Sequence, residues 1–322
     1  MTSRDTGQPL VGAAEAPAPT TGVSTASPEG GAVAAATGGS VAQAGLWGDV
    51  WRQLRRSPQF LLGGVVIVVL VLMAIVPQLF TRVDPRFCDL SRSRRAPSAQ
   101  AWFGYDLQGC DYYANVIYGA RASISVGVLV VGGFLIIALV LGSLAGFWGG
   151  WVDNLIARVA DVLYGMPFIL GAIIILYQFD QRGVPQVAFA LLLLTWMTPM
   201  RLVRASVVAI RDSDYVQAAR ALGASNLRII TRHILPNSLA PVLVYATITI
   251  GAVIAAEAAL SFLGVGLRLP AISWGLMIGE AQNFLRTSLH LLLFPGAFLI
   301  ITVLSFISVG DALRDALDPK LR

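Results

Sequence analysis

Long runs of apolar residues dominate the pattern of this chain, and their lengths fit a lipid bilayer. Because an α-helix rises about 1.5 Å per residue, about 20 apolar residues cross the hydrocarbon core of a membrane. Six runs meet this length, and each predicts a transmembrane helix: Phe60–Phe80, Ile124–Phe147, Leu155–Phe179, Val184–Val208, Leu239–Leu263 and Leu289–Val309. The pattern therefore predicts an all-α membrane protein with six transmembrane helices between residues 60 and 322.

Two other patterns precede the first predicted span. Residues 1–45 contain mostly Ala, Gly, Thr, Ser and Pro, with almost no large apolar side chains. Such a segment buries too little surface to offset its ordering entropy, and it lacks the features of a signal peptide, so we interpret it as a disordered low-complexity tail. Residues 46–59 place apolar side chains at three- and four-residue spacing opposite arginines, which predicts an interfacial amphipathic helix. An irregular lead-in to the first span is the alternative.

Basic residues orient the predicted spans. Six crossings place both termini on one side, and the cytoplasmic ends of spans are enriched in Lys and Arg. The side shared by the termini carries Arg52, Arg55, Arg56, Arg158, Arg201, Arg204, Arg211, Arg220, Arg228, Arg232, Arg314, Lys320 and Arg322. A basic run at residues 82–95 lies on the opposite side and works against this assignment. The balance predicts cytoplasmic N- and C-termini, an external loop at residues 81–123 and a cytoplasmic loop at residues 210–237.

The composition agrees with a lipid environment. The chain is 56% hydrophobic and 13% charged, whereas a soluble domain is roughly a quarter charged. So few charges cannot cover a water-facing surface of this size. The net charge of +5 does not indicate a nucleic-acid partner, because many basic residues flank apolar runs and they form no single face.

Both cysteines of the chain, Cys88 and Cys110, fall in the predicted external loop. A pair confined to the oxidising side of a membrane favours a disulfide, which would restrict an otherwise long loop. Two unpaired thiols are the alternative. A metal site is not expected, because two cysteines without a nearby histidine cannot complete a tetrahedral shell.

The cytoplasmic loop at residues 210–237 predicts a short helix, a sharp turn and a second helix. Polar residues at 212–214 can cap the first helix, and apolar residues then recur at helical spacing. Gly223 can adopt the left-handed conformation that ends a helix. Ser225 can cap the second helix, and Pro236 either stops that helix or begins the next span. An ordinary amphipathic connector is the alternative.

The spacing in this loop resembles the loop of ABC importer permeases in which two alanines are followed by Gly and then by Leu-Pro. In that family the short helix docks in a cleft of the ATPase subunit and transmits its closure. The resemblance assigns the ATPase-coupling role to Tyr215, Gln217, Ala218, Ala219, Arg220, Gly223, Leu235 and Pro236. Gln217 departs from the pattern, because the family usually has an acidic residue there; the amide can still form hydrogen bonds.

Three further stretches, at residues 102–127, 257–275 and 310–319, resemble the C-type permeases of dipeptide and oligopeptide importers, the DppC/OppC branch. With the loop they cover most of residues 47–322. Cys110 stands where that family commonly has Arg, which supports a special role for it with Cys88. The resemblance implies the type I, MetI-like permease fold in a bacterial inner membrane.

The resemblance also implies the partners. They are a second permease similar to DppB or OppB, one or two ABC ATPase subunits, and an external peptide-binding protein. ATP and Mg²⁺ would bind to the ATPase subunits and no cofactor to this chain, which has no phosphate-binding loop: its single lysine, Lys320, follows no Gly-rich sequence. Nickel and glutathione importers share this permease pattern, so the resemblance leaves the cargo open.

Two acidic residues fall inside predicted spans, where an ionisable side chain is costly and is a candidate for function. Asp161 precedes Pro167, which lacks a backbone donor and can bend the span, and Glu257 lies late in the fifth span. We interpret Asp161, Pro167 and Glu257 as candidate pore or gate residues. In the alternative, a neighbouring helix satisfies each carboxylate, with a structural role only.

Two other classes of function fit the sequence less well. A secondary transporter driven by an ion gradient would leave the loop at residues 210–237 without a purpose, and no inverted repeat is evident. A membrane-embedded hydrolase needs a nucleophile and a base in mutual reach, but both histidines, His233 and His290, lie outside the centres of the spans. We therefore assign no catalytic residue and no metal ligand.

Overall fold

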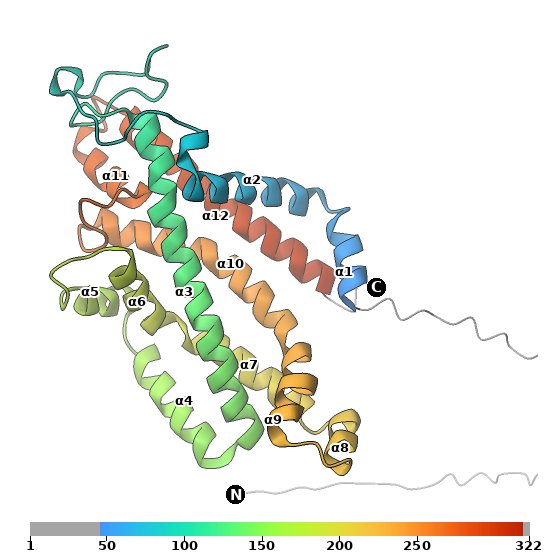
Figure 1. The fold of residues 1–322 in the computed structure, drawn as a ribbon. Coiled ribbons are helices and arrows are strands. Elements are labelled where there is room, and N and C mark those ends of the chain that lie inside the picture. Colours follow the sequence, from blue (N-terminus) through green and yellow to red (C-terminus); the bar gives the residue numbers. More distant parts are fainter. Residues whose placement is uncertain (1–45, 318–322) are drawn as a thin grey trace, which may run out of the picture. The chain divides into compact units, whose positions relative to one another are not determined.

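The computed structural model describes residues 46–317, which fold into α-helices joined by loops, the longest at residues 76–111 (Figure 1). The predicted tail at residues 1–45 and the last residues, 318–322, lie outside this range. The helices are α1 Leu46–Leu54, α2 Pro58–Ile75, α3 Tyr112–Trp148, α4 Gly150–Tyr164, α5 Phe168–Leu176, α6 Val184–Thr195, α7 Met197–Ile210, α8 Asp214–Ala221, α9 Asn226–Ile229, α10 Leu235–Phe262, α11 Trp274–Ala281 and α12 His290–Leu317.

Four stretches of the described chain are single helices long and apolar enough to cross a membrane: α2, α3, α12, and the continuous stretch Asn226–Phe262 that contains α9 and α10. The two remaining apolar runs are each divided into a bent pair of helices. The angle is 89° between α4 and α5 and 46° between α6 and α7. Both runs are therefore bent; the bend beside Pro167 was anticipated from the sequence, and the bend between α6 and α7 was not.

Prolines explain both bends. Pro167 lies directly before α5 and has no N–H to continue α4, which ends at Tyr164. Pro199, in the first turn of α7, cannot donate to the carbonyl of Thr195, the last residue of α6. Each bend thus comes from a missing backbone hydrogen bond.

The long helix α3 is the centre of the fold and packs against α2, α6, α7 and α10 (Figure 1). It begins at Tyr112, well before the predicted start at Ile124, and its length is about 55 Å. Glycines allow the close approach of its neighbours: Gly142 and Gly146 lie against Val203 and Val207 of α7. Small residues serve this purpose in membrane proteins, where packing rather than water exclusion holds helices together.

Helix α1 ends at Leu54, earlier than the predicted boundary at residue 59, because Ser57 starts the next helix. The Ser57 hydroxyl accepts a hydrogen bond from the Phe60 N–H at the first turn of α2. Val50 and Leu54 of α1 are buried against Ala312 and Ala316 near the end of α12. Part of the apolar face of α1 therefore packs on protein.

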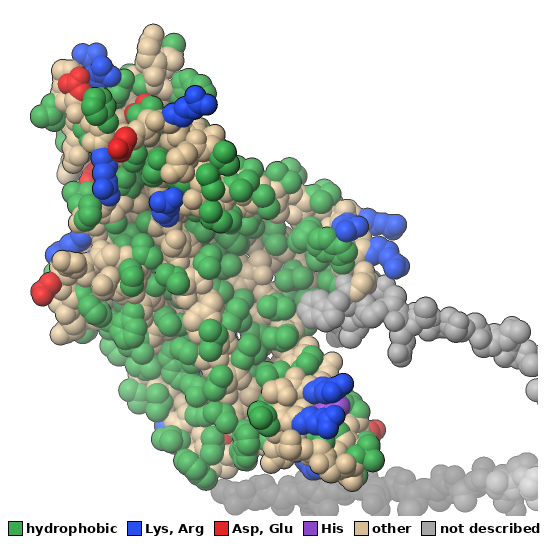
Figure 2. Space-filling view, viewed as in Figure 1, with side chains coloured by type: hydrophobic (Ala, Val, Ile, Leu, Met, Phe, Trp, Pro, Cys, Tyr) green, Lys and Arg blue, Asp and Glu red, His purple; other side chains and the backbone are tan. Residues whose placement is uncertain are grey.

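Charged side chains gather at the ends of the described part. In Figure 2, hydrophobic side chains cover the middle of the visible face, and arginine side chains cluster near the first loop, near α1 and near α8 and α9. The first loop, residues 76–111, and the pair α8 and α9 lie at opposite ends of α3 (Figure 1). This distribution is typical of a protein whose middle lies in lipid.

Substitution of Gly142 tests the close contact between α3 and α7. A Cβ at this position would lie 2.7 Å from both the Met200 carbonyl oxygen and the Val203 Cβ, so Gly142→Ala is expected to destabilise the protein by roughly 1–3 kcal/mol. At Gly132 of the same helix an added Cβ meets nothing within 4 Å. Gly132→Ala is therefore the matched control, and thermal unfolding of the purified protein compares the two. Equal unfolding temperatures would contradict this packing.

Candidate functional site

The α8–α9 segment, residues 210–237, contains the predicted helix, turn and second helix. Helix α8 ends at Ala221, and Gly223 just beyond it has a φ of +80°, a left-handed conformation that favours glycine. The Ser225 hydroxyl accepts from the Arg228 N–H at the start of α9. A π-helical turn, Ile230–Ile234, then joins α9 to α10, and Pro236 lies in the first turn of α10. Of the two roles predicted for Pro236, the structure therefore shows the second: it lies at the start of the long helix α10.

Few side chains attach this segment to the rest of the protein. Val216 of α8 and Ile229 of α9 are fully buried in the main apolar core. The other face of the segment is exposed: Tyr215, Gln217, Ala218 and Arg220 are open to solvent, as are Leu222 and Leu227, which are 88% and 72% exposed. Ala219 and Leu235 are partly covered. Apolar side chains this exposed at the charged end of a membrane protein indicate a surface for a partner.

The segment is also fixed to the end of α3. The Arg211 guanidinium donates to the Gly146 carbonyl over 2.9 Å, and the Arg220 guanidinium lies 5.9 Å from the centre of the Phe147 ring. The segment and the end of α3 are therefore in direct contact.

Gln217 has a role within the segment that an acidic residue cannot have. Its amide Nε2 donates to the Asp212 carbonyl over 2.9 Å, whereas an ionised carboxylate only accepts hydrogen bonds. Ser213 occupies the N-cap position of α8 but forms no side-chain cap; its hydroxyl donates to the Ile210 carbonyl. Gln217 thus holds together the turn before α8.

Glu257 lies fully buried in α10 and accepts hydrogen bonds from three serine hydroxyls. Ser261 donates over 2.8 Å, Ser273 over 3.1 Å and Ser123 of α3 over 3.3 Å. Each of these serines also accepts a backbone N–H, from Leu267, Leu276 and Trp274 respectively. We call Glu257 with Ser123, Ser261 and Ser273 the Glu257 cluster. It joins α3, α10 and the start of α11, so the structural alternative describes Glu257 better than a pore role.

Asp161 of α4 forms an ion pair with Arg201 of α7, and both side chains remain about half exposed. A second pair, between Asp153 and Arg204, is bidentate and joins the same two helices closer to α8. Pro167, at the bend between α4 and α5, takes part in no side-chain hydrogen bond. The structure therefore brings Asp161 to a partner on α7 and keeps it apart from Glu257, which lies among α3, α10 and α11.

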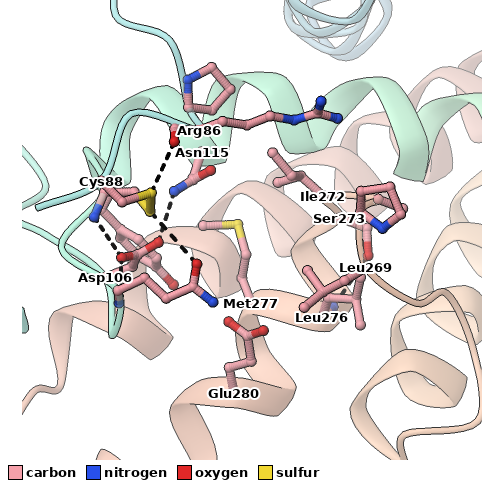
Figure 3. Close-up of a pocket in the computed structure, with 16 residues that line it drawn as sticks. Arg86, Cys88, Asp106, Asn115, Leu269, Ile272, Ser273, Leu276, Met277 and Glu280 are labelled. Carbon is pink, nitrogen blue, oxygen red and sulfur yellow. Dashed lines mark hydrogen bonds between the residues drawn. A yellow bond between two sulfur atoms is a disulfide. The ribbon is translucent and has the colours of Figure 1, made fainter. Parts of the chain in front are cut away.

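Cys88 and Cys110 are joined by a disulfide that closes the first loop. Beside it lies a cavity of about 290 Å³ between this loop and α11 (Figure 3). Asp106 points into the cavity from the loop and Glu280 from α11, on either side of Met277. The Asp106 carboxylate accepts from the N–H groups of Gln108 and Cys110 and from the Asn115 amide, so it is mainly part of the loop's own structure.

Burial raises the pKa of both carboxyls above the usual range. For Asp106, hydrogen bonds from the loop backbone oppose this shift without cancelling it. For Glu280, the negative charge of Asp106 raises the pKa further. No group of His, Cys, Asp and Glu side chains within residues 46–317 has the arrangement of a metal site.

Several residues of these sites were not predicted from the sequence. Ser123, Ser261 and Ser273 give no signal on their own, because their common partner Glu257 is distant in sequence from two of them. Arg201 and Arg204 could have been found, since arginines three residues apart inside an apolar run require partners. Leu222 and Leu227 are ordinary apolar residues in the sequence, and only the fold exposes them.

Two family models match the chain. The model of the binding-protein-dependent transport system inner membrane component matches residues 138–322, and the model of the N-terminal transmembrane domain of oligopeptide transport permease C matches residues 45–97. These matches agree with the resemblance seen in the cytoplasmic loop and in the flanking stretches.

Curated relatives cover most of the chain. The dipeptide transport system permease protein DppC of Alkalihalophilus pseudofirmus is 39% identical, and the match covers 86% of this chain and 90% of the relative. The oligopeptide permease OppC of Bacillus subtilis is 37% identical, with the same shares covered. The glutathione permease GsiD of Pectobacterium atrosepticum is 35% identical and is covered to 92% of its length, against 86% of this chain.

A solved structure has a similar fold. A chain of the inward-facing MetNI methionine ABC transporter is 19% identical, with a TM-score of 0.51, and the match covers 63% of this chain and 96% of that chain. At this identity the likeness concerns the fold alone, which is MetI-like as expected.

Replacement of Glu257 tests the Glu257 cluster. Glu257→Leu leaves three serine hydroxyls without their common acceptor, and each buried polar group left unsatisfied costs about 1–3 kcal/mol. Glu257→Gln keeps the shape and one acceptor oxygen. The unfolding temperature is therefore expected to fall steeply for the Leu variant and slightly for the Gln variant. A Leu variant as stable as the unmodified chain would show that the cluster contributes nothing to stability.

The two carboxyls of the cavity predict a pH dependence. Because the folded-state pKa of Glu280 is raised above its usual value near 4.5, the folded protein holds this proton more tightly than the unfolded chain, and stability falls as pH rises through this range. Glu280→Gln is therefore expected to raise the unfolding temperature at pH 7 more than at pH 4. Asp180→Asn, outside this cavity, is the control. An equal effect of Glu280→Gln at both pH values would contradict the shift.

Proposed function

Since the chain belongs to the family of binding-protein-dependent transport system inner membrane components, we propose that it forms one half of the translocation pore of an ATP-driven peptide importer. The family is a transport component of the bacterial inner membrane and not an enzyme. The pore role, the partners and the cargo are inferences from this membership and from the geometry described above.

The observation that carries the proposal is the exposed face of the α8–α9 segment. Tyr215, Leu222 and Leu227 present apolar surface to solvent, while Val216 and Ile229 hold the segment on the core. A partner that buries an exposed large apolar side chain gains about 1.5–3 kcal/mol for each. We assign this surface to an ABC ATPase subunit, with Ala218 and Ala219 allowing close approach and Arg220 at the rim.

Movement of the segment would reach the transmembrane helices by two routes. The stretch Asn226–Phe262 is continuous, so a force on α9 reaches α10. Arg211 and Arg220 contact the end of α3. Closure of the ATPase subunits on ATP would thus turn α10 and α3 together and open the pore outward, and hydrolysis would reset it. ATP and Mg²⁺ would bind to the ATPase subunits, and this chain would need no cofactor.

We further propose six membrane crossings, counting each bent pair as one, with both termini in the cytoplasm. The permease domain is then residues 60–322, preceded by the interfacial helix and the tail at residues 1–45. The first loop, closed by its disulfide, would face the oxidising side and an external binding protein. A second, homologous permease would complete the pore.

The proposed cargo is a dipeptide or oligopeptide. The relatives named for dipeptide and oligopeptide transport are 36–39% identical to this chain, and those named for glutathione transport are 35–36% identical. Glutathione is itself a small peptide, so it is the second candidate. Nickel, which shares the permease pattern, has no comparable support among these relatives.

Leu222→Asp tests the docking surface. Burial of a carboxylate at this exposed tip is expected to reduce the amount of candidate ATPase that co-purifies by about tenfold, and peptide-stimulated ATP hydrolysis with it. Leu90→Asp, at a similarly open position in the first loop, is the control for co-purification and should leave the amount of bound ATPase unchanged. Retention of normal ATPase binding and hydrolysis by Leu222→Asp would overturn the docking role.

A further inference from the structure

The Asp161–Arg201 ion pair is unusual for a membrane protein because it is exposed. The Arg201 Nη2 lies 2.5 Å from the Asp161 Oδ1, and their side chains are 44% and 55% exposed. The ring of Tyr164, also exposed, lies 5.2 Å from the guanidinium. By contrast, the Asp153 side chain of the neighbouring pair is only 18% exposed.

The exposed pair lies deep within the helices that carry it. Arg201 precedes Arg211 by ten residues, or about 15 Å along the helix, and Arg211 is fixed to the end of α3 beside α8. The hydrocarbon core of a bilayer is about 30 Å thick. The pair therefore lies about 15 Å along α7 from the contact with the end of α3, inside the apolar run at residues 184–208 that is proposed to cross the membrane.

Helix α4 has two different exposed faces. One face carries Asn154, Arg158 and Asp161, at four- and three-residue spacing and all exposed. The other carries exposed apolar residues, among them Leu155 and Val162, which are 57% and 73% exposed. Ala160, between α4 and the core, is fully buried. Lipid is a suitable environment for the apolar face, whereas the polar face needs water or a polar partner.

Helix α7 continues the polar face. Thr198 and Arg201 are exposed at three-residue spacing, and the ion pair joins them to the polar row of α4. Within residues 46–317, Arg158 takes part in no ion pair, so this surface carries one unpaired positive charge beside the paired charges.

A charged side chain that faces hydrocarbon costs about 2.5–3.5 kcal/mol or more, so such residues line water-filled cavities instead. We propose that Asn154, Arg158, Asp161, Thr198 and Arg201 line the aqueous translocation path, and that Asp161 and Arg201 form a transient subsite for the charged termini of a zwitterionic peptide. This inference rests on the proposed function and deepens it by naming the ligand chemistry of the path.

The geometry of the pair suits such a ligand. The ion pair uses one guanidinium nitrogen and one carboxylate oxygen, which leaves donors of Arg201 for a peptide carboxylate and an oxygen of Asp161 for a peptide ammonium. A zwitterion that enters exchanges one ion pair for two, and re-formation of the Asp161–Arg201 pair helps its release. The subsite therefore binds briefly, as passage through a path requires.

Thiol labelling tests the exposure. The chain has no free cysteine, so single-cysteine variants can be labelled in the transporter assembled in lipid nanodiscs, and the label on this chain is then measured after its separation from the partners by denaturing electrophoresis. A membrane-impermeant methanethiosulfonate should react with Asn154→Cys at least tenfold faster than with its neighbour Leu155→Cys, and with Thr198→Cys faster than with Val162→Cys. Equal rates, or slow labelling of Asn154→Cys because the second permease covers it, overturn the assignment.

Protection by peptide tests the subsite. A dipeptide at millimolar concentration should slow labelling of Thr198→Cys at least twofold, and should not do so when Asp161→Asn and Arg201→Gln are added. A dipeptide with both termini blocked should not protect. Protection in both backgrounds, or in neither, overturns the subsite. Co-purification of the ATPase and peptide-stimulated hydrolysis, measured on the same samples, report separately on the proposed function.

Discussion

The Glu257 cluster is the constraint on which the rest of the structure depends. A carboxylate cannot be left unpaired in a helix that crosses lipid, and Glu257 is fully buried with three hydroxyl donors from three parts of the chain. Each serine hydroxyl also accepts a hydrogen bond from a backbone N–H, so the hydrogen bonds continue from Glu257 into the backbone. One side chain thereby fixes α3, the end of α10 and the start of α11 relative to each other.

This fixed point and the exposed α8–α9 segment lie toward opposite ends of one continuous helix. Residues Asn226–Phe262 form a rod of about 55 Å, held at one end by Glu257 and attached at the other by Ile229 and its neighbours. One end of the rod therefore carries open apolar surface on side chains such as Leu227, while the other end is held by buried hydrogen bonds. Between them, small residues let α10, α3 and α12 lie close, with Gly127 against Ile254 and Gly251 against Val303.

Much of this arrangement follows from patterns local in the sequence. Apolar length predicted the helices, Gly223 predicted the end of α8 through its left-handed backbone, and the shared loop predicted the pairing of Cys88 with Cys110. The two bends were harder: Pro167 was recognised as a possible bend, but Pro199 was not, and nothing local sets an angle of 89° against one of 46°. Partners such as Ser123 for Glu257, or Arg201 for Asp161, depend on which helices meet, and one sequence does not encode that in any short pattern.

The π-helical turn at Ile230–Ile234 has a consequence for how the segment can respond to force. A π turn contains one residue more than an α turn of the same height. If it relaxes to α geometry, α9 rotates about the axis of α10 by about 100° and shifts by about 1.5 Å, the step of a single residue, while nearly all backbone hydrogen bonds are kept. The extra residue of the π turn lies next to α9 in the exposed α8–α9 segment. Its loss from the turn would change the direction in which Leu227 points in one discrete step, while α10 stays helical.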